Sequence, residues 1–144
     1  MHQFDKLEME SFTTPDDSYN EHLFFVAIQE YLLQQLNLPY RVLQKCTADI
    51  GKPNARGIDM EVWLPGQGKY RETHTADYMT DYQARRLTTR VRTENGLEFV
   101  HTNDATAFAL GRAMVAIIEN YQTSNGDVCI PEALRPYMGG RKCI

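Results

Sequence analysis

The sequence has no hydrophobic run long enough to cross a membrane. Its longest apolar runs, residues 23–28 and 113–118, fall far short of the roughly 20 residues that a spanning helix needs. The first ten residues contain neither a basic region nor an apolar core, so we expect no signal peptide. With 42% hydrophobic and 24% charged residues, the 144-residue chain is typical of a globular protein with a sizeable core.

The chain also has little cysteine and no excess of positive charge. Its three cysteines, Cys46, Cys129 and Cys143, are an odd number without close spacing. This pattern disfavours both a disulfide framework and a zinc knuckle, and we expect reduced thiols. The net charge of −4 argues against an independent nucleic-acid-binding protein.

Several common catalytic motifs are missing. A P-loop around Gly66-Gln67-Gly68-Lys69 would need a glycine in place of Trp63 and a hydroxyl residue in place of Tyr70. The sequence has no GxGxxG, GxSxG, HExxH or CxxC motif. A metal site built from His74, His101 and Glu72 lacks the usual ligand spacing, so solvated or hydrogen-bonded histidines are the favoured interpretation.

Hydrophobic periodicity predicts an α+β fold. Alternating apolar residues predict strands over 3–13, 40–46, 58–64 and 69–75, and Asn95-Gly96 predicts a hairpin between 86–93 and 97–102. Helical spacing predicts helices over 19–36 and about 107–121. Hairpins favour an antiparallel sheet, with the helices packed on one side.

The second predicted helix carries its apolar residues on one face. These are Leu110, Met114, Ile117 and Tyr121, which we expect to contact the core. Arg112 would leave that face and share another with Phe108. It is either a solvated arginine or one that binds phosphate.

Two glutamates also have alternative interpretations. Glu72 lies near Thr73 and Thr75, and such a group on a strand can bind Mg²⁺ that phosphates hold. The pattern alone favours a cross-strand ion pair with one of Arg85, Arg86, Arg90 or Arg92. Glu8 is either an exposed strand carboxylate or a ligand for an amino group.

Six segments, taken in order, resemble the C-terminal part of the catalytic domain of seryl-tRNA synthetases, which are class II aminoacyl-tRNA synthetases. They are HQFDKLE (2–8), LPYRVLQKCTADIG (38–51), DMEVWLPGQGKYRE (59–72), DYQARR (81–86), HTNDATAFALGRAMVAIIENYQ (101–122) and PEALRPYMGG (131–140). The resemblance implies that residues 1–144 run from the second half of motif 2 through motif 3 of an incomplete class II core. It implies ATP-dependent activation of serine to seryl-adenylate, transfer to the 3′ end of tRNA(Ser), and a cytoplasmic location.

The resemblance also implies an ATP site. Phe4 is similar to the motif 2 aromatic that stacks on adenine, and Arg112 to the motif 3 arginine that grips the phosphates. Glu72 and Thr75 match residues that bind Mg²⁺ and ATP, so the strand is expected to end or bulge between them. The ATP-binding candidates are Phe4, Glu72, Thr73, His74, Thr75 and Arg112, with Glu72 and Arg112 as the catalytic candidates.

Three further residues match the serine pocket of the family. Glu8 is similar to the carboxylate that holds serine, and Thr106 to a hydroxyl residue beside it. Asp104 stands where the family commonly has asparagine. It adds negative charge near a zwitterionic substrate, so we expect a changed affinity for serine or a changed pH dependence.

The resemblance also predicts partners. These are serine, ATP with Mg²⁺, tRNA(Ser) and a second subunit in a longer parent, with no membrane. The tRNA-binding arm, motif 1 and the first strand of motif 2 have no counterpart here. We therefore expect Met1 to be an internal residue, residues 2–10 to form an exposed sheet edge, and the chain alone to be weak or inactive. The alternatives are a ligase that charges a carrier protein and a non-catalytic module that binds a nucleotide or partner.

Overall fold

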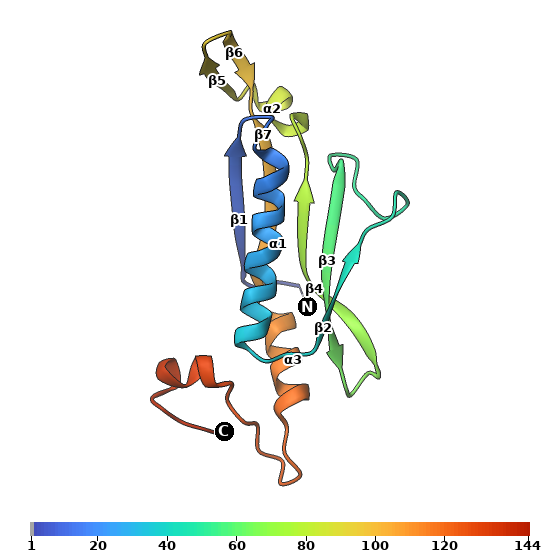
Figure 1. The fold of residues 1–144 in the computed structure, drawn as a ribbon. Helices are drawn as coiled ribbons and strands as arrows, with labels where there is room; N and C mark the ends of the chain where they lie inside the picture. The colour runs from blue at the N-terminus through green and yellow to red at the C-terminus, as the bar shows by residue number, and fades with distance from the viewer. Residues whose placement is uncertain (1) are drawn as a thin grey trace.

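The computed structural model describes residues 2–144, which fold around a five-stranded antiparallel sheet (Figure 1). The strand order is β1-β7-β4-β3-β2, so β1 is an edge strand, and the sheet edge expected for residues 2–10 is confirmed from Lys6 onward. The strands are β1 (Lys6–Thr13), β2 (Tyr40–Gln44), β3 (Arg56–Leu64), β4 (Lys69–Tyr78), β5 (Arg90–Thr93), β6 (Gly96–Phe99) and β7 (His101–Ala109). The helices are α1 (Ser18–Gln35), α2 (Tyr82–Leu87), α3 (Leu110–Tyr121) and the 3₁₀ segment η1 (Glu132–Met138).

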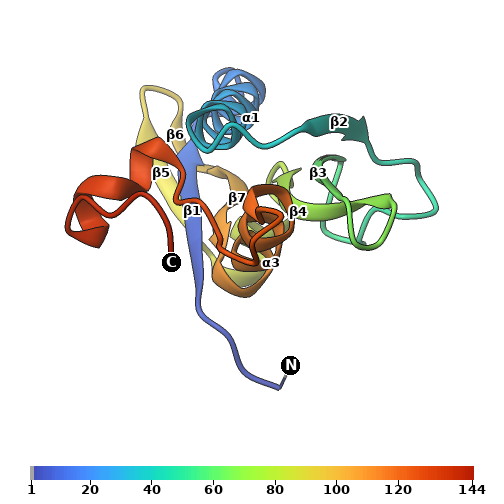
Figure 2. The same cartoon turned by 90° about the horizontal axis from the view of Figure 1, so that it is seen from below.

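Helix α1 covers one face of the sheet, while the N-terminal segment extends from β1 on the other side (Figure 2). The buried residues of α1, such as Phe25 and Leu33, pack on Ile58, Ala76 and Ala105 of the sheet. The fully buried Gln29 also ties α1 to the sheet, because its side-chain nitrogen donates to the carbonyls of Thr75 (2.7 Å) and Thr106 (2.9 Å).

The opposite face of the sheet is polar. Since Ala76 and Ala105 pair in register beneath α1, their neighbours along β4 and β7 point the other way. Asp104 on β7 lies opposite Asp77 on β4 and opposite Glu10 on β1. This polar face, rather than the helix-covered one, can therefore bind a ligand.

The predicted α+β class, the helix at 19–36 and the Asn95-Gly96 hairpin are confirmed. The helix predicted over about 107–121 is confirmed for residues 110–121, but its start is not, because residues 101–109 form the interior strand β7 and α3 begins at Leu110. Phe108 therefore lies on β7, not on a helix face with Arg112. Hydrogen bonding to two neighbouring strands outweighs the helix propensity of the alanines there. Within residues 2–144, no helix is long and apolar enough to span a membrane.

The expected apolar face of α3 is only half correct. Ile117 and Tyr121 pack against the core, and the Tyr121 hydroxyl donates to the Leu36 carbonyl at 2.6 Å. Leu110 and Met114, by contrast, are 48% and 59% exposed. The residues of α3 that reach the core, including the fully buried Ala116, lie in the second half of the helix.

Candidate functional site

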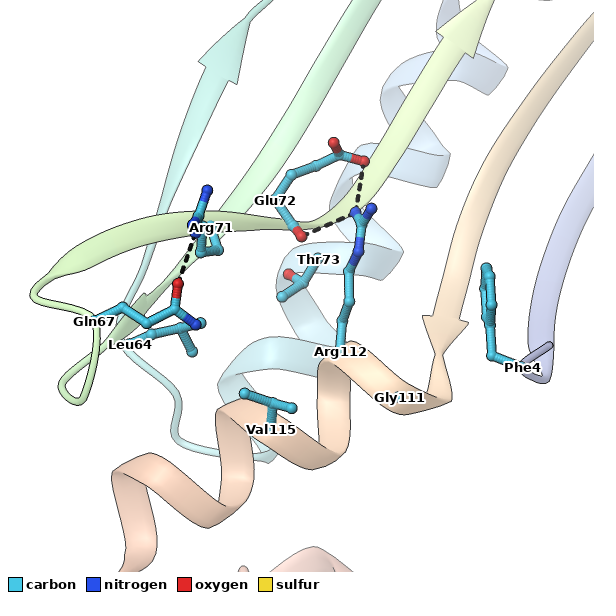
Figure 3. A pocket seen from close by; sticks show the side chains of 9 residues that line it. All are labelled: Phe4, Leu64, Gln67, Arg71, Glu72, Thr73, Gly111, Arg112 and Val115. Carbon is cyan, nitrogen blue, oxygen red and sulfur yellow. Dashed lines mark hydrogen bonds and ion pairs between the residues drawn. The ribbon is translucent and has the colours of Figure 1, made fainter. Parts of the chain in front are cut away.

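A pocket of about 570 Å³ lies where the bent β4 strand, the start of α3 and the N-terminal segment meet (Figure 3). The residues that line it come from these three parts and from the end of β3 and the turn after it: Phe4, Leu64, Gln67, Arg71, Glu72, Thr73, Gly111, Arg112 and Val115. Apolar Leu64 and Val115 lie on one side, and charged groups lie above them. The pocket therefore combines an aromatic ring, an apolar wall and charged side chains.

Arg112 reaches from the first turn of α3 to Glu72 on β4 (Figure 3). Its Nη1 lies 3.1 Å from the Glu72 carboxylate and donates to the Glu72 carbonyl at 3.0 Å. Glu72 thus has an ion pair, but the expected cross-strand partner among the other arginines was wrong. Both side chains are about half exposed, so a ligand can still reach them.

The backbone of β4 bulges at Thr73, as expected from the resemblance. Met60 pairs with His74 and the next residue, Glu61, pairs with Glu72, so Thr73 is the extra residue. Glu72 and Thr75 consequently lie on the same face, since their partners Glu61 and Asp59 do. The bulge makes a shared role for Glu72 and Thr75 geometrically possible.

The two residues between them point away from solvent. The Thr73 hydroxyl donates to the Met60 carbonyl at 3.3 Å, and Thr73 is 4% exposed. The His74 ring is buried against Phe108, with 5.5 Å between ring centroids, and burial lowers its pKa to about 4. The structure therefore brings Phe4, Glu72, Thr73 and Arg112 together around the pocket and leaves the His74 side chain in the core.

The three serine-pocket candidates lie together on β1 and β7. Glu8 pairs with Thr106, whose hydroxyl donates to the Glu8 carboxylate at 3.5 Å, and Lys6 lies 2.7 Å from the other carboxylate oxygen. Burial, followed by the negative charges of Asp77 and Glu10, raises the pKa of Asp104 to about 6. Asp104 is thus a carboxyl group that changes charge near neutral pH.

A buried lysine on the same face escaped the sequence analysis. Lys45 lies 2.8 Å from Asp77 and 3.5 Å from Asp59, and it donates to the Thr75 hydroxyl at 2.9 Å. Gly57 makes room for it, because a Cβ there would overlap Lys45 Cε. The one feature of the sequence that could have pointed to Lys45 was the pair of aspartates at residues 59 and 77, because two carboxylates on strands require a nearby positive charge when they are buried.

Arg71 and Gln67 were also missed, although both lie within a segment that carried the resemblance. The Arg71 Nε donates to the Gln67 side-chain oxygen at 2.8 Å on the side of the pocket away from Phe4 (Figure 3). Among residues 2–144, no group of three or more histidine, cysteine, aspartate or glutamate side chains is arranged to hold a metal ion.

A family model for the tRNA synthetase class II core domain (G, H, P, S and T) matches residues 1–121. The chain belongs to this class II core family. Among its relatives, the serine–tRNA ligase of Thermodesulfovibrio yellowstonii is 49% identical over 140 residues, which are 96% of this chain and 33% of the relative. The serine–tRNA ligase of Methanosarcina barkeri is 48% identical over 143 residues, 99% of this chain and 34% of that protein.

Solved class II structures show the same architecture. The seryl-tRNA synthetase from Pyrococcus horikoshii complexed with ATP gives a TM-score of 0.97 at 44% identity, over 100% of this chain and 32% of that one. The cytoplasmic serine–tRNA ligase from Naegleria fowleri in complex with AMP gives a TM-score of 0.94 at 37% identity, over 100% of this chain and 34% of that one. The chain thus spans about a third of the length of these relatives.

Proposed function

We propose that this chain is the C-terminal part of the catalytic domain of a serine–tRNA ligase and that it carries the binding groups for ATP and serine. The observation that carries this proposal is the pocket in which Phe4, Glu72 and Arg112 converge from three separate segments. Membership of the class II core family and relatives named serine–tRNA ligase support the same reaction.

In this proposal the pocket binds ATP. Phe4 is 56% exposed at the pocket edge, and its ring offers a stacking surface for the adenine base. Arg112 presents a guanidinium group to the triphosphate, a geometry that suits phosphate oxygens. A guanidinium that the Glu72 carboxylate holds in place needs little reorganisation when phosphate arrives.

The polar face next to the pocket binds the amino acid. The Glu8 carboxylate would accept hydrogen bonds from the ammonium group of serine, with Thr106 beside it. Asp104, which titrates near pH 6, adds a second acceptor on this face. The protein thus supplies positions and charges, and the serine carboxylate itself attacks the α-phosphate of ATP, which breaks the bond between the α- and β-phosphates and releases pyrophosphate.

Magnesium fits Glu72 but not Thr75 in the present arrangement. Glu72 offers an accessible carboxylate at the pocket, which is the kind of single protein ligand that Mg²⁺ commonly combines with phosphates. The Thr75 hydroxyl, in contrast, does not line the pocket and already accepts a hydrogen bond from the Lys45 ammonium. Bound Mg²⁺ would neutralise charge on the phosphates.

The remaining functions are proposed for a full-length ligase that would contain this chain. Transfer of serine to tRNA(Ser) and a cytoplasmic location are proposed for it on the strength of its relatives' names, and a homodimer only on the resemblance to the family. For the present chain, we expect ATP binding with weak or no adenylate formation.

The test measures ATP binding by calorimetry and serine-dependent pyrophosphate exchange in the same preparation of the chain. Binding with little exchange is the expected result. Exchange at rates typical of full-length synthetases would refute the expected weakness, and absence of ATP binding to the folded chain would refute the proposed pocket. The matched variant is Arg112→Gln, with Arg141→Gln, an exposed arginine near the C-terminus, as control. Serine-dependent charging of a carrier protein would instead support the carrier-ligase alternative.

A further inference from the structure

Two of the three cysteines face each other where the C-terminal residues run back along the segment that follows α3. Val128 and Ile144 exchange backbone hydrogen bonds in both directions, at 2.8 and 3.0 Å. The Ile130 nitrogen donates to the Lys142 carbonyl at 2.8 Å. Cys129 and Cys143 therefore form the closer, non-hydrogen-bonded pair of a short antiparallel ladder.

The thiols of this pair are in contact. Their Sγ atoms lie 3.3 Å apart, although the residues are 14 positions apart in the sequence. In such antiparallel pairs the Cα atoms lie about 4.5 Å apart, which is within the range that a disulfide spans. Cys143 is exposed and Cys129 partly buried, so an external reagent reaches Cys143 first.

We propose that Cys129 and Cys143 are a redox modification site, a dithiol that small disulfides of the glutathione type convert into an intramolecular disulfide. The Cys143 thiolate attacks one sulfur of glutathione disulfide, which forms a mixed disulfide and releases one glutathione. The Cys129 thiolate then attacks the Cys143 sulfur and releases the second glutathione. The protein loses two electrons and two protons, and the glutathione disulfide gains them.

The disulfide would fix the C-terminal segment onto the end of α3. The Cys129 nitrogen donates to the Tyr121 carbonyl at 2.9 Å, in the last turn of α3. Between the two cysteines lies η1, whose Leu134 packs against the core. Oxidation therefore closes a loop around η1 and removes conformational freedom from the unfolded chain. The site is independent of the proposed ATP and serine chemistry.

The hydrogen bond between the two thiols also governs the rate. It raises the pKa of the Cys143 thiol above its usual range, because the shared proton stabilises the neutral form. We therefore expect oxidation to accelerate as the pH rises from 7 to 9, in step with the thiolate fraction.

The test treats the folded full chain with excess glutathione disulfide, quenches it with acid and alkylates the remaining thiols. The expected result is that Cys129 and Cys143 lose alkylation without gaining glutathione, whereas the isolated, exposed Cys46 gains at most one glutathione. Trypsin cleaves after Lys142, so the dipeptide of residues 143–144 should remain joined to the peptide that contains Cys129. The same treatment in concentrated urea should give less of this disulfide and more mixed disulfides and pairings with Cys46, because unfolding separates the two thiols even though the short loop between them still favours their pairing.

Two variants sharpen the result. Cys46→Ser removes the third cysteine and should leave the disulfide intact, whereas Cys143→Ser should stop at a mixed disulfide with glutathione on Cys129. Oxidised Cys46→Ser should melt several degrees above its reduced form. Mixed disulfides on both Cys129 and Cys143 of folded Cys46→Ser, or full alkylation of both, would overturn the proposal.

Discussion

The Lys45 ammonium nitrogen lies 2.8 Å from the Asp77 carboxylate, and the lysine side chain reaches it by passing over the backbone of Gly57. The same nitrogen contacts Asp59 and Thr75, so one cation links the end of β2 to β3 and β4. Although burial opposes it, pairing with Asp77 raises the pKa of Lys45 above its ordinary value. The polar face thus has a buried positive charge at its centre, with Asp104 across from Asp77.

Gly57→Ala should destabilise the chain by about 1–3 kcal/mol, the usual cost of overpacking. The added Cβ would overlap Lys45 Cε and crowd the Asp77 carboxylate, which forces the lysine out of its pairing. Urea unfolding measures the change. Gly51→Ala is the matched control, because its Cβ would meet its nearest neighbour at an ordinary 3.5 Å. Equal stability of the two variants would contradict the packing argument.

Lys45→Met should cost about 3 kcal/mol at pH 7.5, because it leaves the partly buried Asp59 and Asp77 without their cation. Burial already raises the pKa of Asp59, and loss of the lysine should raise it further. A carboxyl whose pKa is raised in the folded state destabilises the fold as the pH rises. The loss in the free energy of unfolding caused by Lys45→Met should therefore shrink when urea unfolding is repeated at pH 5. Exposed Lys69→Met should show neither effect; a pH-independent deficit would indicate lost packing alone.

Asp104→Asn should stabilise the chain near neutral pH by roughly 1–2 kcal/mol, after allowance for partial solvent screening. Burial and the charge of Asp77 raise the pKa of Asp104 to about 6, well above its unfolded value. Its contribution to stability is therefore complete below about pH 4 and is lost as the pH rises through 6. Unfolding curves between pH 4 and 7.5 should show the variant's advantage growing with pH. Exposed Asp49→Asn should show no such trend.

Local patterns predicted the elements in which one face is apolar. Strand β3 has that character, with Met60 and Val62 buried; in α1 the helical spacing of Phe25 and Leu33 was enough, although its buried face also holds polar His22 and Gln29. Strand β7 was partly missed because its buried residues include polar Thr102 and Asn103, which have no hydrophobic period. A strand inside the sheet can bury polar side chains when they find hydrogen-bond partners. The Asn103 side chain, for example, donates to the Ser18 carbonyl at 3.1 Å.

The residues of the candidate site also fall into a group that the sequence predicted and a group that it did not. Phe4, Glu72 and Arg112 lie in segments that carry a family resemblance, so the sequence could assign them to one pocket. Lys45 and the Cys129–Cys143 pair could not be found, because their significance arises only when separate segments meet. Sequence spacing contains no information about such contacts unless the register of the strands is known.

Phe4→Ala should weaken ATP binding by the chain roughly tenfold, a typical loss for one stacked base. The ring lines the pocket on the side of Arg112 opposite Arg71, and it is 56% exposed and free to receive a flat ligand. Calorimetric titration with ATP gives the affinity, and Phe4→Trp should retain it because the wider ring still stacks. Phe12→Ala is the matched control, since Phe12 is 64% exposed on β1 and does not line this pocket. An equal loss of affinity in both alanine variants would show that the substitutions disrupt the N-terminal segment and β1. Unchanged binding by Phe4→Ala would exclude stacking, because no other aromatic ring lines this pocket among residues 2–144.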